Sequence, residues 1–262
     1  MRLGFPILFL LLFALASPAM AWAPEGHQIA AAIALRELTP AARAQVAALL
    51  GGENVMVLDS SWADEIRQQR PQTVTWHYVN IETGSRGYDA ARDCPGEDCV
   101  VAQIARDARI LSDSHASKPA KAEALRFLIH FVADVHQPLH TADRQDRGGN
   151  DVMVRLGGKR FSLHQVWDQD VVAALGNDSG RIAAEIDGGL SPQQKAQMRG
   201  GGPVDWANES FHLGEREIYA HLPQRGSVRL PDDYALAESG VARLQLARAG
   251  VRLAAMLNGI FR

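Results

Sequence analysis

The sequence predicts a mainly α-helical protein with a single compact domain and one short β-hairpin. Apolar residues recur at intervals of three and four along most of the chain, which is the period of amphipathic helices. One segment alone shows two alternating runs around a Gly-Gly turn, as expected of a hairpin. A length of 262 residues with 47% hydrophobic composition suits one domain with a sizeable core.

The first 21 residues are predicted to be a signal peptide rather than part of the fold. Arg2 precedes a continuous apolar run, and Ala19 and Ala21 form an A-x-A cleavage site. A retained membrane anchor is the alternative, but the run is short for a bilayer span. We therefore expect an exported protein, periplasmic or secreted, with no anchor after cleavage, whose mature domain covers residues 22–262 and begins at Trp22.

Helical patterns occupy the first third of the mature chain. "HQIAAAIALREL" (27–38) and "PAARAQVAALL" (40–50) predict two helices, with Pro40 suited to the first turn of the second. "VLDSSWADEIRQQ" (57–69) predicts a third helix, which ends before Pro71. "VTWHYVNIET" (74–83) alternates β-branched and aromatic residues and predicts an extended segment.

The remaining chain predicts more helices and the hairpin. Residues 100–114 and 121–135 carry helical spacing, and "DVMVRLGGKRFSL" (151–163) is the hairpin. "HQVWDQDVVAALG" (164–176) returns to helix. The chain closes with two long amphipathic segments, 206–222 and 234–261. No repeat or linker divides the domain.

Charge and cysteine usage add two expectations. Loss of Arg2 with the signal changes the formal net charge from −3 to −4, so charge alone does not point to nucleic acid. Cys94 and Cys99 in "DCPGEDC" are the only cysteines. In an exported protein this spacing favours a disulfide that pins a loop, whereas a thiolate metal site would need further cysteine ligands.

Histidine and aspartate residues form a constellation with metal-ligand character. His130 and Asp134 are four residues apart, so they share a helix face, and His140 follows just beyond Pro138. His164 and Asp168 repeat the spacing of four. The remaining candidates lie earlier in the chain, and they are His27, Asp64 and His77.

Imidazole and carboxylate groups are the ligands of zinc and related hydrolytic metals. A single histidine on an apolar face is usually a hydrogen-bonded core residue, but two pairs at this spacing are not explained that way. Eight groups exceed the needs of one tetrahedral ion, so a cluster of two or three metals is predicted. Such clusters serve phosphoryl chemistry, and their positive charge would let an acidic chain bind phosphate. The residues therefore predict a metallo-phosphoesterase; the H-E-x-x-H motif of metalloproteases is absent.

The order and spacing of these motifs resemble the zinc-dependent type I nuclease family, the S-one/P-one class of single-strand-preferring nucleases, and its bacterial relatives. The resemblance runs over the mature chain and rests on the motifs "WAPEGH", "WADEIR", "TWHYVN", "FLIHFVADVHQPLH", "RGGND", "LHQVWD", "WANES" and "LARAGVRLAAMLN". It implies a mostly helical fold with a trinuclear zinc site in a cleft.

The resemblance also implies which residues hold each of three zinc ions. The first ion is assigned to Asp64, His77, His130 and Asp134. The second is assigned to His27 and to the amine and carbonyl of Trp22, with Asp134 as a bridge. The third and more exposed ion is assigned to His140, His164 and Asp168. His136 is not a ligand in this assignment, and we expect it to make a core hydrogen bond.

Catalytic and substrate-binding roles are implied for a further set of residues. Asp64 would orient the attacking water, and Arg67 matches the family's cation that supports the transition state. Tyr78 takes the place of an aromatic residue that stacks on the nucleobase. Asn80 stands where fungal members carry an aspartate that reads the base edge, so the base preference is left open. Gly148 and Asn150 lie in the loop associated with base binding.

The implied activity is hydrolysis of single-stranded RNA and DNA to 5′-phosphate products, together with removal of 3′-phosphates from nucleotides. We expect a monomer without a stable protein partner. Two alternatives remain at this point. A zinc-dependent phospholipase C has a similar cluster, although the second pair here ends in Asp168 where those lipases carry glutamate. A non-catalytic metal-binding protein would need neither Arg67 nor Tyr78.

Overall fold

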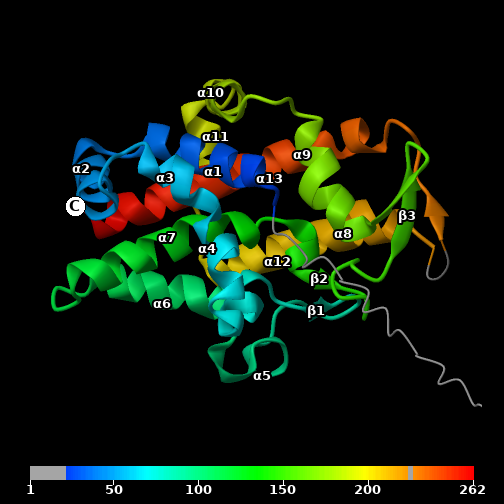
Figure 1. The fold of residues 1–262 in the computed structure, drawn as a ribbon, viewed down its shortest axis with the longest axis horizontal. Coiled ribbons are helices and arrows are strands. Elements are labelled where there is room, and N and C mark those ends of the chain that lie inside the picture. Colours follow the sequence, from blue (N-terminus) through cyan, green and yellow to red (C-terminus); the bar gives the residue numbers. More distant parts are fainter. Residues whose placement is uncertain (1–21, 224–226) are drawn as a thin grey trace, which may run out of the picture.

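The computed structural model describes residues 22–223 and 227–262, so the signal peptide predicted for residues 1–21 lies outside the described residues. Within them the protein is mainly helical, as predicted (Figure 1). The α-helices of two turns or more are α1 (Pro24–Glu37), α2 (Pro40–Leu50), α6 (Val100–Ser112), α7 (Lys118–Asp134), α10 (Ser179–Gly188), α12 (Pro203–Leu213) and α13 (Tyr234–Ile260). The shorter ones are α3 (Val55–Leu58), α4 (Trp62–Glu65), α5 (Ala90–Asp93), α8 (Leu163–Gln165), α9 (Val171–Ala173) and α11 (Pro192–Met198).

The core lies between α1, α7 and α13, and α6 packs along the outer side of α7 (Figure 1). Helices α1 and α13 approach so closely that a Cβ atom at Gly250 would lie 2.5 Å from side-chain carbons of Ile33. Only glycine fits at this crossing. The tight contact fixes α1 against the centre of the molecule, and α1 and α7 both carry predicted ligands.

Helix α7 shows how the sequence positions part of the site. Ser117 caps its first turn by accepting a hydrogen bond from the Ala120 backbone N–H at 3.3 Å. Its second half is buried on all sides, so His130 and Asp134 lie inside the molecule. The helix ends at Asp134, and Pro138 begins a short 3₁₀ turn, η5 (Pro138–His140), that ends at His140.

Strands are few and short. The predicted hairpin is confirmed: β3 (Met153–Leu156) and β4 (Lys159–Ser162) pair antiparallel around the Gly157-Gly158 turn. A third strand, β5 (Val228–Arg229), which was not predicted, pairs parallel with β3. Separately, β1 (Ile81–Glu82) pairs parallel with β2 (Ala142–Asp143). This second pair ties the chain just after Asn80 to the chain just after His140.

The structure corrects two predicted elements. Residues 57–69 do not form one helix. The segment divides into α3, η1 (Asp59–Ser61), α4 and η2 (Ile66–Gln68), and at the first division Ser60 donates its hydroxyl to Val57 O at 2.7 Å. Residues 74–77 are not extended but belong to a 3₁₀ helix, η3 (Pro71–His77). Helices α10 and α11 lie where the sequence patterns predicted no element.

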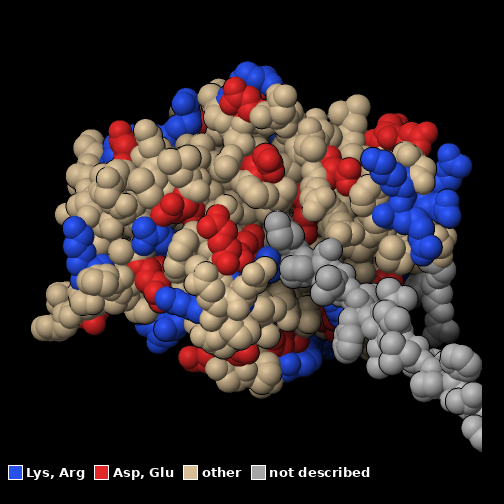
Figure 2. All heavy atoms as spheres, in the orientation of Figure 1, with Lys and Arg blue, Asp and Glu red and all other residues tan. Residues whose placement is uncertain are grey.

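The disulfide loop and the distribution of charge on the surface are the remaining features of the fold. The Cys94–Cys99 disulfide is confirmed, with an S–S distance of 2.04 Å. Acidic and basic side chains alternate over most of the visible face, but basic ones gather over the hairpin end (Figure 2). Among the described helices, none is both long enough and apolar enough to span a bilayer.

Candidate metal centre

The structure brings the eight predicted histidine and aspartate ligands together at the centre of the molecule. They come from α1, α4, η3, α7, η5, α8 and the π-helical turn η6 (Val166–Asp170). Three groups have potential ligand atoms within 4.8 Å of one another, and they are His27–Asp64–His130, His77–His130–Asp134 and His140–His164–Asp168. Groups that are up to 141 positions apart in the sequence therefore converge on one site.

The deepest part of the site surrounds Asp134, which is fully buried. Its Oδ2 atom lies 3.0 Å from His77 Nδ1 and 3.1 Å from His130 Nε2. Its Oδ1 atom faces the other way, 3.6 Å from His27 Nε2. One oxygen of this carboxylate thus faces His77 and His130 while the other faces His27, which is the arrangement required of a bridging ligand.

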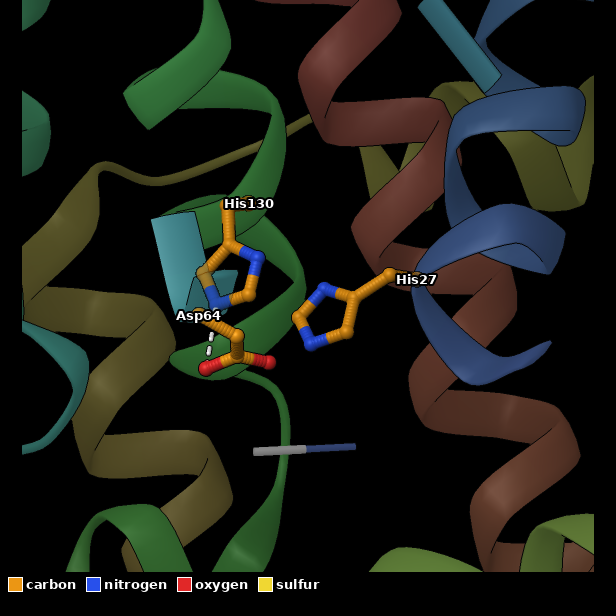
Figure 3. A group of neighbouring side chains, drawn as sticks. All are labelled: His27, Asp64 and His130. Atoms are coloured by element: carbon orange, nitrogen blue, oxygen red, sulfur yellow. Dashed lines mark ion pairs between the residues drawn. The ribbon is translucent and has the colours of Figure 1, made fainter. Parts of the chain in front are cut away.

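His27 and Asp64 complete this side of the site (Figure 3). His27 projects from α1 and stacks on His130, with ring centroids 3.9 Å apart. Asp64 projects from α4 toward both rings, and its Oδ1 atom lies 3.6 Å from His130 Nε2. The three side chains point toward a shared space between α1, α4 and α7 (Figure 3).

The third group depends on local structure around α8. Ser162 and Gln165 form a capping box that begins α8, and this fixes the backbone at His164. The helix then widens into the π-helical turn that carries Asp168, and such turns are frequent at functional sites. His164 Nε2 lies 3.2 Å from Asp168 Oδ2, and His140 stacks on His164 with centroids 5.1 Å apart.

The second ring nitrogens of three histidines are held by backbone carbonyls. His130 Nδ1 lies 2.8 Å from Ser60 O, His140 Nδ1 lies 2.9 Å from His77 O, and His164 Nδ1 lies 2.7 Å from Gly148 O. Each Nδ1–H donates to its carbonyl, which leaves each Nε2 facing the site. Outer hydrogen bonds of this kind orient histidine ligands in metal proteins.

Several ligand atoms are buried without any hydrogen-bond partner among the described residues. They include both ring nitrogens of His27, His77 Nε2 and Asp134 Oδ1. His164 Nε2 and Asp168 Oδ2 belong to the same set, because their 3.2 Å approach lacks hydrogen-bond geometry. Leaving such atoms unpaired costs free energy, which a bound cation would recover. The donor set of nitrogen and carboxylate oxygen, its geometry and its unpaired atoms therefore fit divalent metal ions.

The pKa values at the site agree with this fit. Burial lowers the pKa of His140 to about 3 and that of His164 to about 4, so both imidazoles are neutral at physiological pH, as metal ligands must be. Burial also lowers the pKa of His27. At His130 burial acts in the same sense, but Asp134 and Asp64 outweigh it and raise the pKa to about 9. That point of the site therefore attracts positive charge.

Trp22, the predicted new N-terminus, lies beside the ligands. Its indole is fully buried and donates to Ala133 O at 3.0 Å, next to Asp134. The following residue, Ala23, donates its backbone N–H to Asp168 O at 2.9 Å. The chain start is thus fixed between two ligand-bearing elements, and a role for its amine and carbonyl stays a prediction.

Arg67 is placed to meet a bound anion. Its Nη2 atom lies 2.8 Å from Asp64 Oδ1, and its side chain is 11% exposed. This contact holds a guanidinium against the edge of the metal site while part of it still faces solvent. A residue in this position can donate to phosphoryl oxygens without a large rearrangement.

The predicted substrate residues lie on segments that adjoin the ligand-bearing elements. Tyr78 is partly exposed, directly after the ligand His77, and its carbonyl accepts from Val100 N–H at 3.1 Å. Asn80 is exposed before β1. Gly148 has φ of +61°, and a Cβ atom there would lie 2.2 Å from Leu139 O, so the turn requires glycine. Asn150 donates to Arg147 O at 2.8 Å, which supports the loop.

The sequence analysis missed Gln137, whereas its expectation that His136 makes a core hydrogen bond is confirmed. Gln137 is fully buried and donates from Nε2 to Asp168 Oδ1 at 2.7 Å. His136 is not among the ligand groups; its Nδ1 lies 2.7 Å from Val132 O, and its Nε2 accepts from Arg252 Nη1 at 2.8 Å. The position of Gln137 between the predicted ligands Asp134 and His140 was the available sequence signal, although its partner Asp168 is 31 residues away.

Comparison with known proteins links this geometry to a family. The family description "S1/P1 Nuclease" matches residues 22–262. The chain is 31% identical to Endonuclease 4 of Arabidopsis thaliana over 280 residues, which covers 96% of this chain and 93% of that protein. It is 34% identical to Nuclease P1 of Penicillium citrinum over 154 residues, covering 56% and 57%. It is 28% identical to Nuclease S1 of Aspergillus oryzae over 165 residues, covering 60% and 57%.

Proposed function

The chain belongs to the S1/P1 nuclease family and is a zinc-dependent hydrolase of phosphodiester bonds, and from this premise we propose that it cleaves single-stranded RNA and DNA to 5′-phosphate products. The observation that carries the proposal is the convergence of three ligand groups beside a guanidinium. A 3′-nucleotidase activity at the same site is part of it. The proposal also includes a bacterial source, export after cleavage behind Ala21, and a monomeric state.

The residues that would hold zinc are those of the three groups; His130 belongs to two of them, and the second carboxylate oxygen of Asp134 faces His27 of the neighbouring group. Zinc bound there would supply a nucleophile from water at neutral pH and charge stabilisation at the leaving oxygen. Three ions per chain follow from the three groups together with the amine of Trp22. The unpaired Nε2 of His164 and Oδ2 of Asp168 are the atoms of the third group that would bind its ion.

Arg67 and Asp64 would act on the phosphate and the water. The guanidinium of Arg67, anchored on Asp64, would donate to the equatorial phosphoryl oxygens as they gain charge. Asp64 lies at the edge of the site with its side chain 8% exposed, close enough to orient an attacking water. Its carboxylate therefore has two tasks, ligation and orientation.

Tyr78 gives the physical basis for preferring single strands. Its ring is partly exposed next to the ligand His77, where an unpaired base could stack on it. Such stacking contributes about 1–3 kcal/mol per base, and a base in a duplex would first have to leave its partner. The turn at Gly148 would border the same base.

The proposal is tested with the processed chain, residues 22–262, loaded with zinc. We expect faster hydrolysis of a single-stranded oligonucleotide than of its duplex, loss of activity with a chelator, and no hydrolysis of phosphatidylcholine. Arg67→Ala is expected to lower kcat by about 10²–10³ while the zinc content is kept. Equal rates on the two nucleic acids, or an Arg67→Ala variant with unchanged kcat, would contradict the proposal.

A further inference from the structure

A row of three arginines crosses the small sheet at the hairpin end of the molecule. Arg155 of β3 is the direct partner of Arg160 on β4 and of Arg229 on β5. Directly paired residues project from the same face of a sheet, so the three side chains lie next to one another. All three residues are exposed. Neighbouring strands lie about 4.8 Å apart, so the row spans roughly 10 Å.

The charges in this row are not neutralised within the described part of the chain. None of the three arginines makes an ion pair with a described acidic group, although most other arginines do. The three strands contain a fourth cation, Lys159, and no acidic residue. Figure 2 shows the resulting concentration of basic side chains at this end of the surface.

Like charges placed directly opposite in a sheet destabilise it. The strands here are only four, four and two residues long, so they have little pairing energy to offset that repulsion. The net charge of the whole chain is −3, so the row is not the result of a generally basic composition. An anion bound across the row would remove the repulsion.

The sheet leads directly into the metal centre. Arg160 is four residues before the ligand His164, so their Cα atoms are at most about 14 Å apart. The pairing continues beyond β4, since Leu163 N–H donates to Val152 O at 2.8 Å and His164 N–H donates to Gly149 O at 3.3 Å. A strand cleaved at the metals would therefore pass within a few nucleotides of the row.

We propose that Arg155, Arg160 and Arg229 form a binding row for the phosphate backbone of the substrate strand on one side of the cleaved bond. This inference rests on the proposed nuclease function and adds a contact outside the metal centre. The row neutralises up to three phosphates and reads no base, so it raises affinity for long strands over dinucleotides without changing base preference.

The test replaces the row with glutamine (R155Q/R160Q/R229Q) in the zinc-loaded chain. A matched control, R109Q/K118Q/R243Q, removes three exposed cations from α6, α7 and α13 that make no ion pair with a described residue. Affinity is measured by anisotropy of a labelled 20-nucleotide phosphorothioate strand, which keeps the backbone charge and resists cleavage. Turnover is measured on an unmodified 20-mer and on a dinucleoside monophosphate.

We expect the row variant to bind the 20-mer roughly tenfold or more weakly at low salt, with the slope of log Kd against log salt reduced by about 2. Its kcat/KM should fall on the 20-mer and stay unchanged on the dinucleotide, and the control should match the wild type. Equal weakening by the control, or an unchanged salt slope in the row variant, overturns the proposal. A wild type that binds the 20-mer through the row but cleaves neither substrate refutes the nuclease function instead.

Discussion

At the scale of single residues, Gln137 is the side chain that most directly completes the third ligand group. Its amide has two partners, since Nε2 donates to Asp168 Oδ1 and Oε1 accepts from Leu139 N–H. This fixes the Asp168 carboxylate with only Oδ2 free. It also fixes the turn that carries His140, one residue beyond Leu139. One amide thus orients two ligands.

Replacement of Gln137 by methionine is expected to weaken zinc binding at this group by about 10–100-fold, the usual effect of losing an outer hydrogen bond to a metal ligand. Methionine keeps the approximate volume but offers Asp168 no donor. The measurement is zinc per chain after dialysis against a zinc-buffered chelator series. We expect one ion to leave at a higher free zinc concentration than in the wild type.

Gln103→Met provides the matched control for this experiment. Gln103 is also buried and also makes two hydrogen bonds, to Glu97 O and from Arg106, but lies on α6 away from the ligands. Its variant should retain the wild-type zinc titration. If both variants retain it, Gln137 has a structural role only.

At the scale of elements, local patterns predicted most of the longer helices and the hairpin. Helix α7 and the hairpin follow from spacing and turn residues that lie next to one another in the chain. The single helix predicted for residues 57–69 was wrong, because the break in this segment is fixed by a distant contact in which Ser60 O accepts from His130 on α7. Strand β5 has only two residues and depends on β3 for its pairing. Tertiary contacts override local preference at both places.

Helix α6 carries a buried carboxyl group that predicts how stability varies with pH. Asp107 is 2% exposed, and its Oδ2 has no hydrogen-bond partner among the described residues. Burial raises its pKa from 3.8 to about 8. Between pH 4 and 8 the unfolded chain releases this proton while the folded protein keeps it, so the free energy of unfolding falls as pH rises through this window.

Asp107→Asn is expected to remove that part of the pH dependence. Relative to the wild type, the free energy of unfolding of the variant should be little changed at pH 4 and higher by a few kcal/mol at pH 8, because asparagine has no proton to lose. Unfolding of both proteins by guanidinium chloride at several pH values between 4 and 8 gives the difference in their free energy of unfolding. The effect of zinc is shared by the two proteins and cancels in this difference. The exposed Asp232→Asn serves as the control. A difference that does not change with pH would show that Asp107 is ionised in the folded protein.

At the scale of the whole molecule, the sequence predicted which histidines and aspartates gather at the site better than how they are grouped. His130–Asp134 and His164–Asp168 could be paired from their spacing alone. The contact between His27 and His130, 103 positions apart, depends on α1 packing beside α7. No local pattern contains that information. The family resemblance supplied one grouping; the structure reproduces its third group, whereas it places His27 with Asp64 and His130.

The predicted start of the mature chain lies beside the ligand groups and gives the last prediction. The fully buried indole of Trp22 and the backbone of Ala23 are held next to Asp134 and Asp168. A free amine offers a lone pair to a metal, whereas an amide nitrogen does not. One alanine added before Trp22 should therefore lower the zinc content by one ion per chain and reduce turnover of single-stranded RNA. The same alanine added after the exposed Arg262 should change neither. If the N-terminally extended chain matches the processed one in zinc content and rate, Trp22 is not a ligand, and signal cleavage does not complete the site.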